Sequence, residues 1–157
     1  MESDASKPQT TIEWGLLGQS IGPRIRLLRN ALTARSISAS APYGLPTGSL
    51  TVLALIAANT GSSQTALARS AGLNKSALVG IVDELEARGL AARDRSERDR
   101  RRNSLSVTPE GEEVMRTLFT AVTTNEAPIR DALGQQDMTL LLSLLDRAIE
   151  AVQEADG

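Results

Sequence analysis

The fold is decided by residues 63–89, which read SQTALARSAGLNKSALVGIVDELEARG. Ser63 and Asn74 are residue types that cap the N-termini of helices, and Gly89 suits the left-handed conformation that ends a helix. Residues 71–73 are all that separate the two helices marked by these signals. A short helix, a tight turn containing glycine and a longer helix predict a helix-turn-helix.

The longer helix of this pair has one apolar face. Its residues repeat at helical spacing and are Leu78, Ile81, Val82 and Leu85. The side chains near the start of this helix therefore face away from the core, where a recognition helix contacts the edges of DNA bases. The candidate DNA-binding residues on this side are Asn74, Lys75, Ser76, Ala77, Val79 and Gly80. The alternative interpretation is an ordinary packed helix.

A basic segment follows the helix-turn-helix. Residues 90–93 and 104–108 predict two strands of a β-hairpin. Between them, the segment RDRSERDRRR at 93–102 holds six arginines and three acidic residues. Such a block is a candidate contact for nucleic acid, and the arginines expected near DNA phosphates are Arg95, Arg98, Arg100 and Arg102. The alternative is a run of charges exposed to solvent, partly paired with its acidic neighbours.

An apolar stripe precedes the helix-turn-helix and predicts a long helix over residues 12–37. Its members are Trp14, Leu17, Ile21, Ile25, Leu28 and Leu32. Pro23 lies inside this range, and an interior proline removes a hydrogen bond, so we expect a kink or a break into two helices. Residues 38–46 contain two prolines and a glycine and predict a connector. Thr47 or Ser49 is the predicted cap of the next helix.

Two further helices are predicted after the hairpin. The first begins at Pro109 after a Thr108 cap and ends near Asn125. Its residues expected to face inward are Val114, Leu118, Phe119 and Val122. Ala127-Pro128 and Gly134 interrupt the helical signal, and a final helix begins near Asp137. The first and last helices have larger apolar stripes than a compact winged helix can cover, and exposed stripes of this size are usually interfaces, so we expect a homodimer.

The central residues also carry a resemblance to a known family. Its most specific part is Asp99-Arg100-Arg101, followed after six residues by Thr108-Pro109-Glu110-Gly111 and preceded by the boundary Leu85…Arg88-Gly89-Leu90. With these motifs, residues 67–111 resemble the core of the MarR family of bacterial transcription regulators. The resemblance implies a mainly α fold with a small β-hairpin wing, in which a winged helix-turn-helix is joined to a helical dimerisation region. The implied divisions are a flexible arm at 1–10, a dimerisation helix and connector at 11–46, the DNA-binding domain at 47–108 and dimerisation helices at 109–157.

The resemblance also implies how the chain recognises DNA. It suggests a homodimeric repressor that binds a pseudo-palindromic operator in double-stranded DNA. Arg101 would enter the minor groove, with Asp99 orienting it. Where the family commonly has a threonine and an arginine near the base edges, this chain has Ala77 and Gly80, which favours methyl contacts and DNA shape over hydrogen-bond readout. The alternative for the whole chain is a winged-helix interaction module or anti-regulator that binds no operator.

A small lipophilic or phenolic effector is a further implication of the resemblance. It would lie in a cleft between the dimerisation and DNA-binding parts. The candidate lining residues are Trp14, Arg29, Tyr43, Leu53 and Phe119. The alternative for each of them is an ordinary core residue.

Composition removes several other classes of function. The 157 residues include no Cys and no His, which excludes disulfides, thiol or imidazole catalysis and Cys/His zinc sites. The acidic residues Asp83, Glu84 and Glu86 are interpreted as the solvated face of a helix, so we expect neither an enzyme nor a bound cofactor or metal. No apolar stretch is long enough to span a membrane. The polar residues 1–10 lack the features of a secretory signal, and a cytoplasmic location is expected.

The net charge of −2 is unevenly distributed along the chain. Residues 61–108 contain nine Lys and Arg against six Asp and Glu, whereas residues 109–157 contain three against ten. The predicted DNA-binding part is therefore basic within an acidic protein, as contact with phosphates requires.

Overall fold

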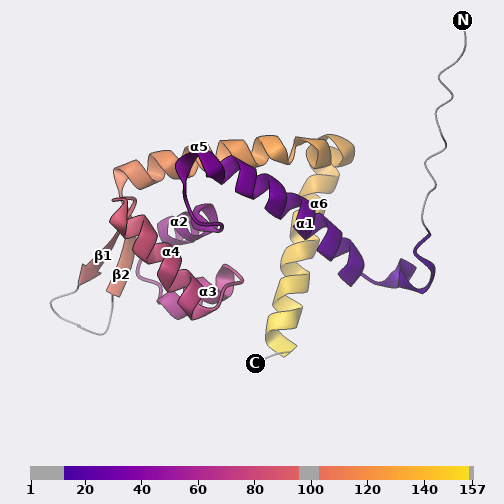
Figure 1. Cartoon of the computed structure of the whole chain (residues 1–157). Helices are drawn as coiled ribbons and strands as arrows, with labels where there is room; N and C mark the ends of the chain where they lie inside the picture. Colours follow the sequence, from indigo (N-terminus) through magenta and orange to yellow (C-terminus); the bar gives the residue numbers. More distant parts are fainter. Residues whose placement is uncertain (1–12, 96–102, 156–157) are drawn as a thin grey trace, which may run out of the picture.

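The computed structural model describes residues 13–95 and 103–155. In chain order its elements are η1 (Gly15–Gln19), α1 (Gly22–Ser40), η2 (Ala41–Tyr43), α2 (Ser49–Ala58), α3 (Gln64–Ser70), α4 (Lys75–Ala87), β1 (Ala91–Arg95), β2 (Asn103–Val107), α5 (Pro109–Asn125) and α6 (Ala127–Ala155). A small lobe contains α2, α3, α4 and the hairpin, while α1, α5 and α6 extend away from it (Figure 1). The predicted architecture, a winged helix-turn-helix with additional helices, is confirmed.

The hydrophobic core lies in this lobe and where α5 joins it. Its buried apolar residues run from Leu45, before α2, to Leu118 in α5. They include the whole predicted stripe of α4, which is Leu78, Ile81, Val82 and Leu85. The hairpin adds Ala91, which pairs with Val107 across the strands, and Leu105. Burying one large apolar side chain contributes about 1.5–3 kcal/mol, so these contacts hold α4 firmly in the lobe.

Three helix starts have the predicted side-chain caps. The side-chain oxygens of Ser63, Asn74 and Thr108 accept hydrogen bonds from the backbone amides three residues further on, at 3.1, 2.8 and 3.0 Å. Each bond satisfies an amide that has no partner within its own helix. The boundaries of α3, α4 and α5 therefore follow from local chemistry that the sequence already contains.

The start of α2 differs from the prediction. Gly48 occupies the N-cap position with a φ of 93°, and no side chain caps the helix. Ser49 is the first helical residue, and its Oγ donates to the Pro46 carbonyl at 2.7 Å. The predicted cap by Thr47 or Ser49 is wrong because a left-handed residue, which glycine adopts without strain, makes the turn into α2.

The expected break near Pro23 is present. The short η1 ends before Ser20, and α1 then begins at Gly22 with the proline in its first turn, where a missing amide is tolerated. The helix continues to Ser40, so the predicted connector at 38–46 begins too early. Helices usually end at or before the residue that precedes a proline, and here Ala41 precedes Pro42.

The C-terminal helices leave much apolar surface uncovered. Gly134 interrupts α6 with a φ of 69° and a ψ of 175°, as predicted. The predicted start near Asp137 is wrong, because α6 already begins at Ala127 with Pro128 in its first turn, where a missing amide is tolerated. Leu118 is buried, but Phe119, expected to face inward, is 59% exposed in the single chain. None of the residues of α6 is buried, and its exposed large apolar residues are Leu140, Leu142, Leu144, Ile149 and Val152. Within the described ranges, no helix is both long enough and apolar enough to cross a membrane.

Candidate nucleic-acid interface and adjoining cavities

The start of α4 presents a polar, sterically open surface. Its exposed residues include Asn74, Lys75, Ser76 and Gly80, while Ala77 and Val79 are half-buried. The first amides of a helix and a nearby lysine attract phosphate oxygens. Neither Ala77 nor Gly80 has a hydrogen-bonding side chain, so this surface suits methyl contacts and close backbone approach to a groove. The fold thus brings the six predicted residues of this helix together at one end of α4.

Arg93 fastens the hairpin to α4. Its Nη2 contacts Asp83 Oδ1 at 2.7 Å, and its Nη1 contacts Glu86 Oε2 at 2.6 Å. The Arg93 amide also donates to Glu86 Oε1 at 3.0 Å. Asp83 and Glu86, interpreted from the sequence as a solvated face, instead hold the first strand. The orientation of the hairpin relative to α4 is therefore fixed by a multidentate contact, which is stronger than a single exposed ion pair.

Most of the predicted wing residues lie outside the described part of the chain. They are Arg98, Asp99, Arg100, Arg101 and Arg102. Arg95 is the last residue of β1, and its backbone is paired with that of Asn103. The structure thus describes the two strands at the base of the hairpin (Figure 1).

A tight junction joins the hairpin to α5. The Thr108 hydroxyl donates to the Gly89 carbonyl at 2.6 Å, and the Thr108 amide donates to the Leu90 carbonyl at 3.1 Å. Gly111, in the first turn of α5, packs against the same strand entrance. A Cβ on Gly111 would lie 1.9 Å from the Leu90 carbonyl oxygen. The junction therefore has room for glycine and for no larger residue at this position.

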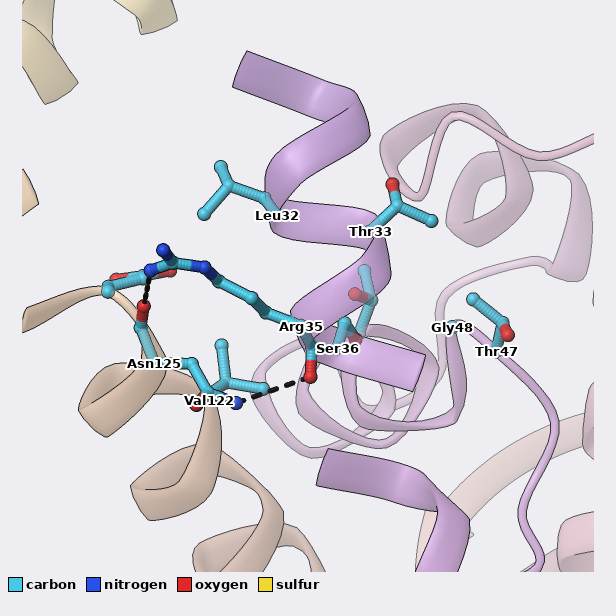
Figure 2. A pocket seen from close by; sticks show the side chains of 10 residues that line it. Leu32, Thr33, Arg35, Ser36, Thr47, Gly48, Val122 and Asn125 are labelled. Carbon is cyan, nitrogen blue, oxygen red and sulfur yellow. Dashed lines mark hydrogen bonds between the residues drawn. The ribbon is translucent and has the colours of Figure 1, made fainter. Parts of the chain in front are cut away.

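A cavity whose lining residues mostly have polar side chains, here called the polar cavity, lies between α1, the start of α2 and the end of α5 (Figure 2). Its volume is about 250 Å³, and its polar lining residues include Thr33, Arg35, Ser36, Thr47, Thr51 and Asn125. The Arg35 guanidinium donates to the Asn125 carbonyl at the end of α5, and Asn125 Nδ2 donates to the Arg35 carbonyl at 3.2 Å. This reciprocal pair ties α1 to α5 and places one cation at the wall of the cavity.

An apolar cavity of about 300 Å³ adjoins the polar one. Leu28 of α1, Phe119 of α5 and Leu141 of α6 are among its lining residues. The two cavities share Leu32, Val122 and Glu126. The Glu126 carboxylate is paired with Arg130 Nη2 at 3.0 Å. Together the cavities place one guanidinium, one carboxylate and several hydroxyls next to an apolar compartment.

The structure separates the five predicted effector residues. Phe119 lines the apolar cavity, whereas Leu53 is fully buried in the core. The Arg24 guanidinium stacks on the Trp14 ring, with Cζ 4.8 Å from the ring centroid.

The two remaining residues of that set lie elsewhere. Arg29 is exposed beside Asn30, and Tyr43 contributes its carbonyl to Arg88. Arg35 was not among the predicted effector residues, because nothing in a helical pattern distinguishes it from Arg29 until α5 is placed against α1.

Comparison with known proteins gives consistent results. A model of the MarR family matches residues 43–102. A protein of Thauera aromatica described as a transcriptional regulatory protein for the hcr operon is 35% identical over 114 residues, which cover 73% of this chain and 68% of that protein.

Solved structures extend the similarity to most of the chain. The transcriptional repressor CouR bound to a 23-mer DNA duplex has a TM-score of 0.75 and 29% identity, covering 88% of this chain and 99% of that one. CouR from Rhodococcus jostii RHA1 bound to p-coumaroyl-CoA has a TM-score of 0.70 and 29% identity, covering 84% and 91%.

Proposed function

Because the chain belongs to the MarR family of transcription regulators, we propose that it is a homodimeric repressor. It binds a pseudo-palindromic operator in double-stranded DNA and leaves it when a small lipophilic anion binds. The observation that carries the DNA-binding part is the exposed, capped start of α4 beside a hairpin that Arg93 holds in place. The similar repressor CouR, bound to a DNA duplex, supports the same reading.

The dimer is supported by the apolar surface that one chain leaves open. The stretch η1–α1 has large exposed apolar side chains, and so has α6. Leu17, Ile25, Leu144 and Val152 are examples. A second copy packed on these helices would remove them from water and place two α4 helices against half-sites about 34 Å apart.

The effector proposal is supported by the two adjoining cavities. In the polar cavity, Arg35 offers a guanidinium that suits a carboxylate, phosphate or phenolate oxygen. In the apolar cavity, Phe119 and its aliphatic neighbours suit an aromatic ring or acyl chain. The binding of p-coumaroyl-CoA by a similar repressor is consistent with a ligand that has both parts.

The operator proposal is tested by selecting bound duplexes from a random DNA pool with the wild type and with Arg101→Ala. The wild type should enrich an inverted repeat with half-sites about 10 base pairs apart. The variant should bind that repeat about 10–100-fold more weakly, because one groove contact by arginine contributes about 1–3 kcal/mol.

The matched control for this selection is Arg69→Ala, on α3 outside the hairpin, whose Nη2 donates to the Gln153 carbonyl at 3.3 Å. If no sequence is enriched and all three proteins retain DNA equally weakly and in a salt-sensitive way, the result would favour the alternative of a protein-interaction module.

The effector proposal is tested by titrating p-coumaroyl-CoA into the wild type and into Arg35→Ala. The variant should bind this probe about 10–100-fold more weakly, because a hydrogen bond to a charged group contributes about 1.5–3 kcal/mol. Arg29→Ala, on the same helix but beside Asn30 at the surface, is the control and should bind like the wild type. Calorimetry that gives equal dissociation constants for all three proteins would contradict a ligand site at Arg35.

A further inference from the structure

The connector between α1 and α2, residues 41–48, is hydrogen-bonded to Arg88 at the C-terminal end of α4. Arg88 donates from Nη1 to the Tyr43 carbonyl at 3.0 Å and from Nη2 to the Gly44 carbonyl at 2.9 Å. Its Nε donates to Glu84 Oε1 at 2.6 Å, which fixes the plane of the guanidinium. The planar fork of arginine matches two adjacent acceptors in a way that a lysine ammonium does not.

A second contact joins the connector to the same face of α4. A Cβ on Gly48 would lie 3.4 Å from Ile81 Cδ1, so the connector backbone rests directly against this buried side chain. Ile81 and Arg88 are seven residues apart in the sequence, which is about two turns of an α-helix. The connector therefore contacts α4 at two points along one side.

The connector is also a wall of the polar cavity. Thr47 and Gly48 line that cavity together with Ser36 of α1 (Figure 2). Gly48 thus lies between the cavity and Ile81 of α4. A ligand that fills the cavity contacts one side of the connector, while α4 holds the other.

We propose that Arg88 is a positioning residue that transmits occupation of the polar cavity to α4. This inference rests on the proposed function, in which that cavity receives the effector. A ligand shifts an equilibrium only by binding two arrangements with different affinity. Here the two arrangements differ in the position of the connector. Because Arg88 is hydrogen-bonded to the connector, α4 moves together with it. By linkage, DNA held by α4 weakens ligand binding by the same factor.

A merely structural role for Arg88, as the residue that ends α4, predicts a different result. In that case its replacement lowers stability but leaves the response of DNA binding to an occupied cavity unchanged. The informative variant is Arg88→Lys, which keeps the positive charge and can still reach Glu84. Glu84→Gln is its control, since it removes the helix ion pair and retains the bonds to Tyr43 and Gly44.

The experiment measures affinity for the selected operator duplex by fluorescence anisotropy, with and without saturating p-coumaroyl-CoA. A second way of filling the cavity, the substitution Ser36→Phe, needs no ligand. In the Arg88 background, either treatment is expected to weaken duplex binding about 10-fold, within the range usual for allosteric coupling. In the Arg88→Lys background the loss should fall below about 2-fold, whereas Glu84→Gln should respond like the wild type.

Equal losses in the Arg88 and Arg88→Lys backgrounds would overturn the coupling role while leaving the proposed repressor intact. A wild type that binds no duplex would instead contradict the proposed function. The coupling would then be measured by hydrogen exchange of the backbone amides of residues 75–87. Ser36→Phe should change the protection of these amides in the Arg88 background and not in Arg88→Lys, and an identical change in both would refute the proposal.

Discussion

Replacing Gly111 by alanine is expected to lower the free energy of unfolding by about 3 kcal/mol or more, at the upper end of what overpacking costs. The added Cβ would lie 1.9 Å from the Leu90 carbonyl oxygen and 2.8 Å from Val107 Cγ1. The first contact is to backbone, so no side-chain rotation relieves it. Relief requires α5 to move away from the hairpin, which breaks the bonds that Thr108 makes to Gly89 and Leu90.

Thermal unfolding followed by circular dichroism measures this effect. A change of this size should lower Tm by about 6–12 °C at this chain length. Gly80→Ala is the matched control, because a Cβ there meets nothing within 4 Å and the residue lies inside α4. That variant should be as stable as the wild type or up to about 1 kcal/mol more stable. Similar melting temperatures for the Gly111 variant and the wild type would show that the junction yields more easily than its geometry indicates.

A charge on the exposed face of α6 is expected to separate the proposed dimer. Leu144 is 46% exposed in the single chain, and Leu144→Glu would place a carboxylate in the interface. Sedimentation should then change from a dimer to a species of 16.7 kDa, the mass of one chain. Affinity for the operator should fall about 100-fold or more, because the second half-site no longer benefits from attachment to the first.

Ser143→Glu controls for charge on the same helix. Ser143 is exposed and is the sequence neighbour of Leu144, and successive helical residues point in directions about 100° apart. This variant should remain dimeric and keep its duplex affinity. If the Leu144 variant also sedimented as a dimer with unchanged affinity, the interface would have to lie away from this face of α6.

The sequence predicted those features that depend on neighbours in the chain. The caps at Ser63, Asn74 and Thr108 and the buried stripe of α4 follow from local hydrogen bonding and helical spacing. The left-handed turn at Gly48 that starts α2 was not predicted, because the adjacent Thr47 and Ser49 are both residue types that commonly cap helices. Local patterns are therefore sufficient to predict α4 and its buried face.

Features that depend on distant packing could not be read in this way. Arg35 and Asn125 are 90 residues apart in the chain, so their reciprocal bonds become visible once α1 lies against α5. The acidic residues Asp83 and Glu86 gain a partner when the hairpin folds back and brings Arg93 to them. Phe119 fits a buried helical position by pattern, yet one chain alone leaves it exposed.

The location of the core has a consequence for how the proposed repressor responds to its own abundance. Its buried apolar residues run from Leu45 to Leu118, and α6 contributes none. A monomer therefore keeps a folded helix-turn-helix lobe but makes half of the operator contacts of the proposed dimer. At low copy number, assembled pairs increase with the square of the number of chains, so a twofold change in synthesis produces a larger change in operator occupancy. In the proposed dimeric repressor, gene dosage would therefore be a second input to repression, separate from any small molecule.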